Sequence, residues 1–141
     1  MALTLEQSVA WASTQKTAVL ITLRKDGRAQ SSDVTYAVIG GSIVISLTAT
    51  RAKTANMRRD PRVVLHITNP ESWSYVSFDA IADLGPVTMG PGDEASDNLV
   101  AYYRAVAGEH DDWDEYRAAM VNEQRQLLRL RLSSVVGQIN A

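Results

Sequence analysis

The feature that most constrains this fold is a series of short strand-like segments separated by glycine-containing turns. Residues 18–23 are apolar at every position but one, which is typical of a strand that is covered on both faces. The pair Asp26-Gly27 follows at once and is typical of a tight hairpin turn. Gly40-Gly41 gives a second turn of the same kind. The first half of the chain therefore predicts strands that pair antiparallel with their neighbours.

The same reading along the whole chain predicts about six strands and a few short helices. The strands are expected at residues 18–23, 29–39, 43–47, 63–68, 74–89 and 126–139. Thr4 and Gln7 form a capping-box pattern that opens a helix through about residue 13. Two further helical stripes lie between the last two strands, one at Leu99, Val100, Tyr103 and Val106 and one at Trp113, Tyr116 and Met120. These elements predict a small closed or split antiparallel β-barrel.

The length and the pattern of residues 18–23 bear on domain organisation and assembly. The 141 residues are enough for one domain, residues 1–141, and neither flank of the glycine-rich loop at residues 90–94 could form its own core. A strand that is apolar on both faces indicates that the outer face of the barrel is also covered. A homodimer interface would supply that cover.

Composition excludes several classes of function. There is no cysteine, which excludes disulfides, thiolate nucleophiles and zinc–thiolate sites. The net charge of -2 gives no general attraction to nucleic acid or to an anionic membrane. No secretory signal is evident at residues 1–5, and the apolar runs are too short to cross a bilayer. We therefore expect a cytoplasmic protein with a small-molecule substrate and with neither nucleic acid nor membrane as a partner.

One short helix is expected at residues 50–61, and its charges are arranged against its dipole. Thr50 is the expected N-cap, and Pro61 stops the helix because it disfavours helical geometry at the residue before it. Arg51 and Lys53 lie in the first turn, where unpaired backbone N–H groups are already positive. Such an arrangement favours an anion site, for which phosphate is the usual occupant.

Other common sites have little support in the sequence. His66 and His110 do not have the spacing of metal ligands, so no metal site is expected. His66 reads as a structural residue on a strand face, and His110 as part of a loop that caps a helix. The glycine-rich loops that bind nicotinamide dinucleotides or ATP are missing from the sequence. No side chain is singled out as catalytic, and a proton could come from solvent or from a nearby Tyr or Ser.

Several motifs in sequence order resemble one known superfamily. They are Gly27-Arg28-x-Gln30-x-Ser32, the run from Arg51 to Pro61, Trp73-Ser74-Tyr75, Tyr103-Arg104 with Gly108 to Trp113, and Tyr116-Arg117-x-Ala119-Met120. Together they resemble the split-barrel flavin and deazaflavin oxidoreductases, a superfamily named for pyridoxamine 5'-phosphate oxidase. The match is closest to the actinobacterial branch that binds the deazaflavin coenzyme F420. The resemblance implies a homodimeric, six-stranded antiparallel split β-barrel (the FMN-binding split barrel).

The resemblance also implies a set of coenzyme-binding residues. Residues corresponding to Arg51, Ala52, Lys53 and Asn56 bind the phosphate end of the coenzyme in that branch. The deazaflavin ring lies along positions corresponding to Gln30, Ser31, Ser32, Ser46 and Thr48. Trp73 is expected to complete the site across the dimer interface, from either protomer. The implied activity is hydride transfer from reduced F420 to an unsaturated or conjugated organic substrate.

Alternatives to this activity remain open at the level of sequence. The chain ends in Arg129-Leu130-Arg131-Leu132-Ser133-Ser134 and lacks the C-terminal motif by which true pyridoxamine phosphate oxidases bind their substrate. FMN would suit the same helix end, so an FMN-dependent oxidase or reductase is one alternative. A non-catalytic protein that binds or stores F420 is a second, and a haem-binding split barrel, disfavoured by the scarcity of histidine, is a third.

Overall fold

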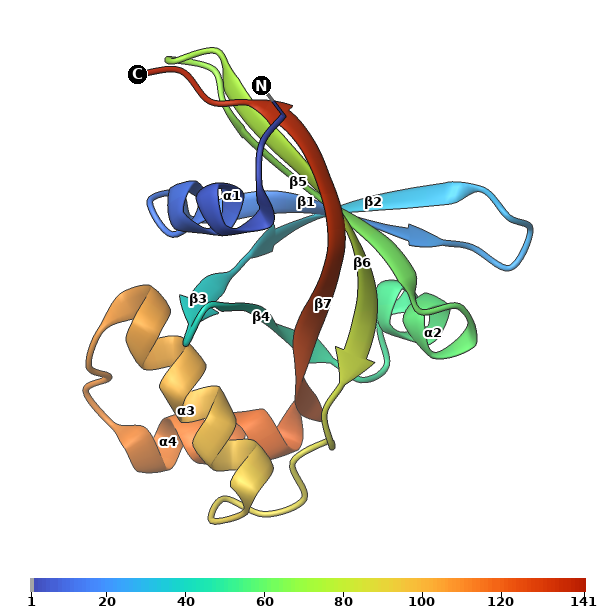
Figure 1. Cartoon of the computed structure of the whole chain (residues 1–141). Coiled ribbons are helices and arrows are strands. Elements are labelled where there is room, and N and C mark those ends of the chain that lie inside the picture. Colours follow the sequence, from blue (N-terminus) through green and yellow to red (C-terminus); the bar gives the residue numbers. More distant parts are fainter. Residues whose placement is uncertain (1) are drawn as a thin grey trace.

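The structure, a computed structural model, describes residues 2–141, which form four helices and seven strands (Figure 1). The first half contains helix α1 (Leu5–Ala12), strands β1 (Thr17–Leu23), β2 (Ala29–Thr35), β3 (Ala37–Ile39) and β4 (Ser42–Thr48), and helix α2 (Ala52–Arg59). The second half contains β5 (Arg62–Asn69), β6 (Ser74–Leu84), α3 (Glu94–Ala107), α4 (Trp113–Asn122) and β7 (Arg125–Gln138).

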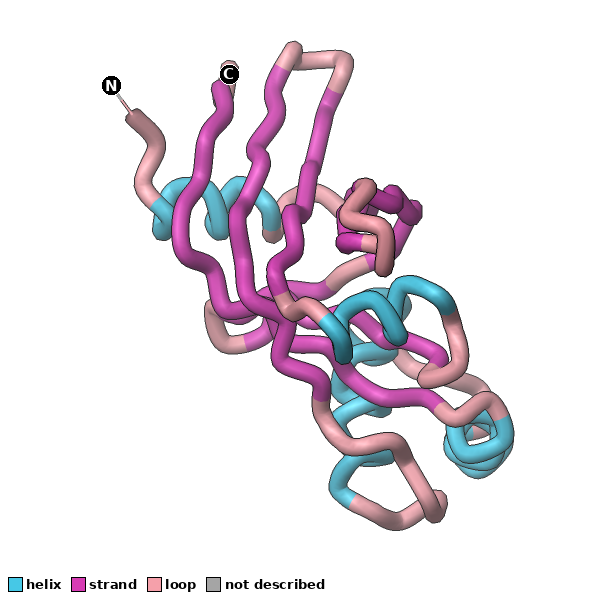
Figure 2. Tube along the Cα trace, turned by 90° about the vertical axis from the view of Figure 1, so that its right-hand side faces the viewer, coloured by secondary structure: helices cyan, strands magenta, loops and turns pink. Residues whose placement is uncertain are grey.

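All seven strands belong to one antiparallel sheet with the order β2-β1-β5-β6-β7-β4-β3. The long strands β6 and β7 run through the middle of this order, and their register shifts between Asp79 and Ala80. Such an irregularity bends the paired strands. The sheet curls around its own inner face as a half-barrel (Figure 2), and the mainly β, antiparallel prediction is confirmed.

The sequence predicted six strands, and this number was wrong because the expected strand at residues 29–39 divides at Tyr36. β2 pairs with β1 at one edge of the sheet, whereas β3 pairs with β4 at the other edge. The Tyr36 side chain is buried between them, and its hydroxyl donates to the Ala12 carbonyl oxygen at 2.6 Å. The tyrosine therefore anchors the crossing to the end of α1. β6 is also shorter than predicted and ends at Leu84, because Pro86 has no N–H to donate to a ladder.

The core lies inside the curl of the sheet. Leu20 of β1, Leu65 of β5 and Phe78 of β6 are fully buried there. Ile45 of β4 and Leu128 of β7 close the same cluster from the other side. The side chains on the opposite face of β1 are only half-buried. One chain therefore covers one apolar face of this strand fully and the other only in part.

The helices cover the ends of the curled sheet. The predicted capping box of α1 is present, with the Gln7 N–H donating to the Thr4 hydroxyl and the Thr4 N–H donating to the Gln7 side chain. α3 and α4 pack together beside β3 and β4 around a separate apolar cluster that contains Leu99 and Met120 (Figure 1). Across residues 2–141, every helix is too short or too polar to span a bilayer.

Candidate functional site

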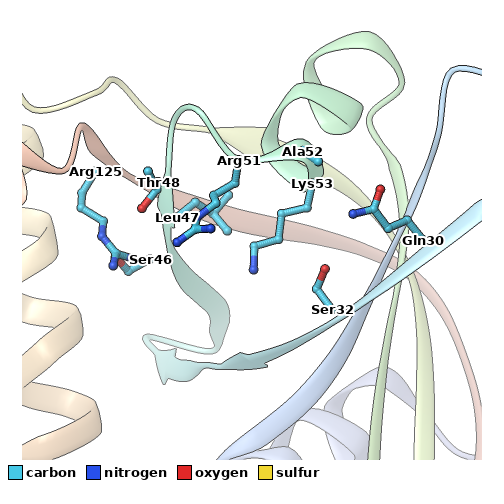
Figure 3. Close-up of a pocket in the computed structure, with 9 residues that line it drawn as sticks. All are labelled: Gln30, Ser32, Ser46, Leu47, Thr48, Arg51, Ala52, Lys53 and Arg125. Carbon is cyan, nitrogen blue, oxygen red and sulfur yellow. The ribbon is translucent and has the colours of Figure 1, made fainter.

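A cavity of about 440 Å³ opens where β2, β4, α2 and the start of β7 meet (Figure 3). Hydroxyl, amide and positively charged side chains dominate its wall. The lining residues are Gln30, Ser32, Ser46, Leu47, Thr48, Arg51, Ala52, Lys53 and Arg125. The volume falls within the range of about 300–1,000 Å³ that is usual for small-molecule sites.

The start of α2 differs by one residue from the sequence prediction. Arg51, not Thr50, is the N-cap residue, and its extended backbone precedes the first helical residue, Ala52. An arginine side chain has no acceptor, so no side chain caps this helix end. The first N–H groups of α2 are therefore free to bind an acceptor from outside the chain.

The electrostatics of the cavity favour an anion. Burial lowers the pKa of the Lys53 amine, and the nearby positive charges of Arg51 and Arg125 lower it further. The residues that line the cavity include no carboxylate to balance these three cations. A bound anion would relieve their repulsion and would also accept from the helix N–H groups.

The structure brings seven of the ten predicted site residues together at this cavity. They are Gln30, Ser32, Ser46, Thr48, Arg51, Ala52 and Lys53. Figure 3 shows the Lys53 amine between the Arg51 guanidinium and Ser32, with Gln30 beyond Ser32. The hydroxyl and amide groups lie on the strand side of the cavity, and the cations lie at the start of α2 and of β7.

Ser31 does not line the cavity, because successive residues of a strand point to opposite faces of a sheet. Gln30 and Ser32 are on the cavity side of β2, and Ser31 between them is exposed on the other face. Its partner in β1 is Ile21, which belongs to the outer face. Within one chain Ser31 therefore lies outside the candidate site.

Asn56 lies behind the cavity wall and supports it. Its side chain is buried and donates to the Thr22 hydroxyl and to the Gln30 side-chain oxygen, both at 3.1 Å. Its own amide oxygen accepts from the Arg59 guanidinium at 2.9 Å. Asn56 therefore positions Gln30 and does not line the site itself.

Trp73 is remote from the cavity within one chain. It lies in the turn between β5 and β6 with 83% of its surface exposed and a left-handed φ of 55°. That turn lies beside the C-terminus at the top of Figure 1, on the far side of the molecule from α2. Trp73 could reach a coenzyme site only in an assembly of more than one chain.

Two lining residues, Leu47 and Arg125, were missed at the level of sequence. Arg125 is the first residue of β7 and pairs with Thr48 of β4, so the sheet register carries its side chain to the cavity. Leu47 is buried in the strand beneath. No local motif marks either position, because both follow from a pairing between strands far apart in the sequence.

The two histidines lie away from this cavity. His66 is on the outer face of β5, with its ring 5.6 Å from that of Tyr75. His110 accepts from the Asp112 N–H at 2.8 Å through Nδ1, and the Asp112 side chain caps α4, so His110 lies in a helix-capping loop as expected. Among the residues described, no group of three His, Asp or Glu side chains is arranged to hold a metal ion.

Comparison with known proteins places the chain in a family. The family described as pyridoxamine 5'-phosphate oxidase matches residues 4–138. Among solved structures, a conserved hypothetical protein of Mycobacterium tuberculosis, Rv2991, is similar with a TM-score of 0.76 and 22% identity, over 96% of this chain and 84% of the other. An F420 reductase is similar with a TM-score of 0.65 and 19% identity, over 85% of this chain and 88% of the other. A heme binding protein from Mycobacterium smegmatis has a TM-score of 0.70 and 22% identity, over 95% of this chain and 53% of the other. At these identities the similar structures establish the shared split-barrel-like fold.

Proposed function

This chain belongs to the pyridoxamine 5'-phosphate oxidase family, and from that premise we propose that it is an oxidoreductase that uses reduced coenzyme F420 to transfer a hydride to an unsaturated or conjugated organic substrate. The observation that carries the proposal is a cluster of three cations, with no carboxylate among the lining residues, in a cavity whose strand side is lined by hydroxyl and amide groups. An F420 reductase with the same fold supports it.

The residues of the cavity fit a coenzyme that carries a phosphate. Arg51, Lys53 and the first N–H groups of α2 are the expected donors to the phosphate oxygens. Lys53 is only partly exposed, so its charge is less screened by solvent than that of a surface lysine. These groups would fix one end of the ligand and so set the position of the other.

The strand side of the cavity fits the polar edge of a flat ring. The Gln30 side-chain oxygen accepts from Asn56, which turns the Gln30 amide nitrogen toward the cavity (Figure 3). Ser32, Ser46 and Thr48 add hydroxyl groups that can donate or accept. When bound, reduced F420 would supply the hydride, and these neutral groups would hold its ring in place.

Titration of the purified protein with oxidised F420, followed by fluorescence quenching, tests the proposal. We expect micromolar binding of F420 that is tighter than the binding of FMN measured in the same way. FMN is the main alternative because its phosphate would suit the same cations, and a protein that purifies yellow with bound flavin would favour it. Failure of the wild-type protein to bind F420 would remove the proposal.

A turnover assay separates an enzyme from a coenzyme-binding or storage protein. The protein with reduced F420 is mixed with a panel of quinones, enones and tetrapyrroles, and the formation of oxidised F420 is followed by absorbance. We expect at least one member of the panel to accelerate oxidation over the protein-free rate. Tight binding without turnover on any member would support storage instead.

We also propose that the protein is a homodimer formed through the outer face of the sheet. This face carries the half-buried side chains of Val19 and Ile21 in β1, Val64 in β5 and Ile81 in β6. A shallow groove of about 400 Å³ runs along Ile21, Val64 and Ile81. A second copy would cover this apolar surface and would let Trp73 of one protomer approach the cavity of its partner.

Ile21→Asp tests the dimer directly, because it places a charge in the centre of that face. We expect light scattering to give twice the mass of one chain for the wild-type protein and the mass of one chain for the variant. Met89→Asp is the matched control, since Met89 is an exposed apolar residue on a loop outside this face, and it should remain dimeric. A monomeric wild-type protein at micromolar concentration would rule the dimer out.

A further inference from the structure

Arg125 enters the candidate site from a different element than the other two cations. It is the first residue of β7, and its pairing with Thr48 in β4 places it across the cavity from the start of α2. Figure 3 shows its guanidinium beside Ser46, with that of Arg51 between it and the Lys53 amine. In this view the three cations form a row, and Arg125 is at the end of it.

The backbone holds Arg125 in this position. Gln124, just before it, has a left-handed φ of 54°, a conformation that costs free energy for a residue with a side chain. Its carbonyl oxygen accepts from the Ala49 N–H at 2.9 Å, which ties this turn to the chain leading into α2. The Arg125 carbonyl oxygen accepts from the Thr88 N–H at 2.9 Å. The strained turn is therefore fixed from two sides, and Arg125 starts from a rigid position.

Arg125 has one acidic partner, and it lies outside the cavity. The Nε and Nη2 atoms of Arg125 donate to Oε1 of Glu123 at 3.1 and 2.8 Å. Glu123 is the C-cap of α4, where the helix dipole makes a negative charge unfavourable. Glu123 does not line the cavity, and its side chain is 45% exposed against 29% for Arg125. The pair is half-solvated, so a more highly charged anion could compete with Glu123 for the guanidinium.

We propose that Arg125 is a third anion-binding group of this site and that its pairing with Glu123 restrains it. The site then takes a ligand whose negative charge is spread over several oxygens, of the phosphate-ester or pyrophosphate type. On binding, Arg125 exchanges at least one hydrogen bond with Glu123 for one with the ligand. The inference rests on the anion-binding part of the proposed function and is independent of the ring chemistry.

Calorimetric titration of the full chain with inorganic pyrophosphate tests this inference without F420. We expect Arg125→Gln to weaken pyrophosphate binding at least threefold and Glu123→Gln to tighten it at least twofold. The double variant should bind like Arg125→Gln alone, because Glu123 acts only through Arg125. Arg125→Lys keeps the charge but loses the planar fork, and it should fall between the wild type and Arg125→Gln.

The chain offers a closely matched control pair. Arg62 is the first residue of β5 and pairs with Asp60 two residues earlier, as Arg125 pairs with Glu123 at the start of β7. Arg62 does not line the cavity, so Arg62→Gln and Asp60→Asn should leave pyrophosphate affinity unchanged. A thermal melt of each variant establishes that it is folded.

Each possible result of the pyrophosphate titrations either supports or overturns one part of the inference. Equal affinity in the wild type, Arg125→Gln and Arg125→Lys would overturn the role of Arg125. Weaker or unchanged binding in Glu123→Gln would overturn the restraint. No pyrophosphate binding by the wild type would overturn the whole inference. The expected pattern with pyrophosphate, together with no binding of F420, would uphold the inference while removing the proposed coenzyme.

Discussion

Replacing Lys53 by alanine is expected to weaken the binding of oxidised F420 by a factor of about 10–100. A charge-assisted hydrogen bond from a partly buried donor is worth about 1.5–3 kcal/mol, and each 1.4 kcal/mol is about a tenfold change in affinity. Lys53 is such a donor because its amine is partly buried. This burial, together with two neighbouring cations, lowers its pKa. Fluorescence quenching titrations of the wild type and the variant measure the difference.

Lys25→Ala is the matched control for this substitution. Lys25 is an exposed lysine in the turn between β1 and β2 and does not line the cavity, so its loss should leave F420 affinity unchanged. A Lys53→Ala protein that binds within twofold of the wild type would contradict the assignment of the phosphate end.

Salt and pH should act on the same interaction. The affinity of the wild type should fall as ionic strength rises, because the attraction is between charges. It should also decline as the pH rises into the alkaline range, since Lys53 loses its proton. A lowered pKa moves that loss below the pH at which an ordinary lysine titrates. The salt dependence of Lys53→Ala should be shallower than that of the wild type.

The part of the site that the sequence predicted is the part that depends on local signals. The helix α2, with cations in its first turn, can be predicted from about a dozen consecutive residues. The cavity lies at the start of this helix, as expected. The exact N-cap was wrong by one position, because the choice between Thr50 and Arg51 depends on the path of the preceding strand. Helix ends are the least certain feature of such a reading.

The remaining site residues depend on pairings that a local pattern does not contain. Arg125 reaches the cavity only because β7 lies beside β4, and no short-range pattern fixes that register. Ser31 was predicted together with its neighbours, but strand alternation sends it to the other face. The break at Tyr36 likewise lies where β2 and β3 pair with different strands, and the Tyr36 hydroxyl bonds there to the Ala12 carbonyl oxygen, a contact that only the folded chain supplies.

Gly137 in β7 is a further position whose importance only the folded chain explains. Its φ is 156°, and β7 passes so close to β6 here that a Cβ atom would lie 2.2 Å from the Tyr75 carbonyl oxygen and 2.9 Å from the Val76 Cα. Both are backbone atoms of the neighbouring strand and cannot turn aside as a side chain would. A side chain at this position requires the two strands to separate.

Gly137→Ala is therefore expected to lower the free energy of unfolding by about 2 kcal/mol, the middle of the range for overpacked interiors. Separation of the strands would also strain three hydrogen bonds that Asn140 donates near this end of β7. Its backbone N–H donates to the Ser74 hydroxyl, and its side-chain amide donates to the carbonyl oxygens of Ser72 and Trp73. For a chain of this size the melting temperature should fall by roughly 6–8 °C. Thermal unfolding followed by circular dichroism measures the shift.

Two other glycines test whether close approach is the cause. A Cβ at Gly92 would meet no atom within 4 Å, and Gly92→Ala should leave the melting temperature nearly unchanged. A Cβ at Gly85 would lie 3.1 Å from the Leu127 carbonyl oxygen, so Gly85→Ala should give an intermediate loss. If the three losses do not follow this order of distances, backbone crowding does not determine them. A melting temperature of Gly137→Ala equal to that of the wild type would mean that β6 and β7 can separate at this end without cost.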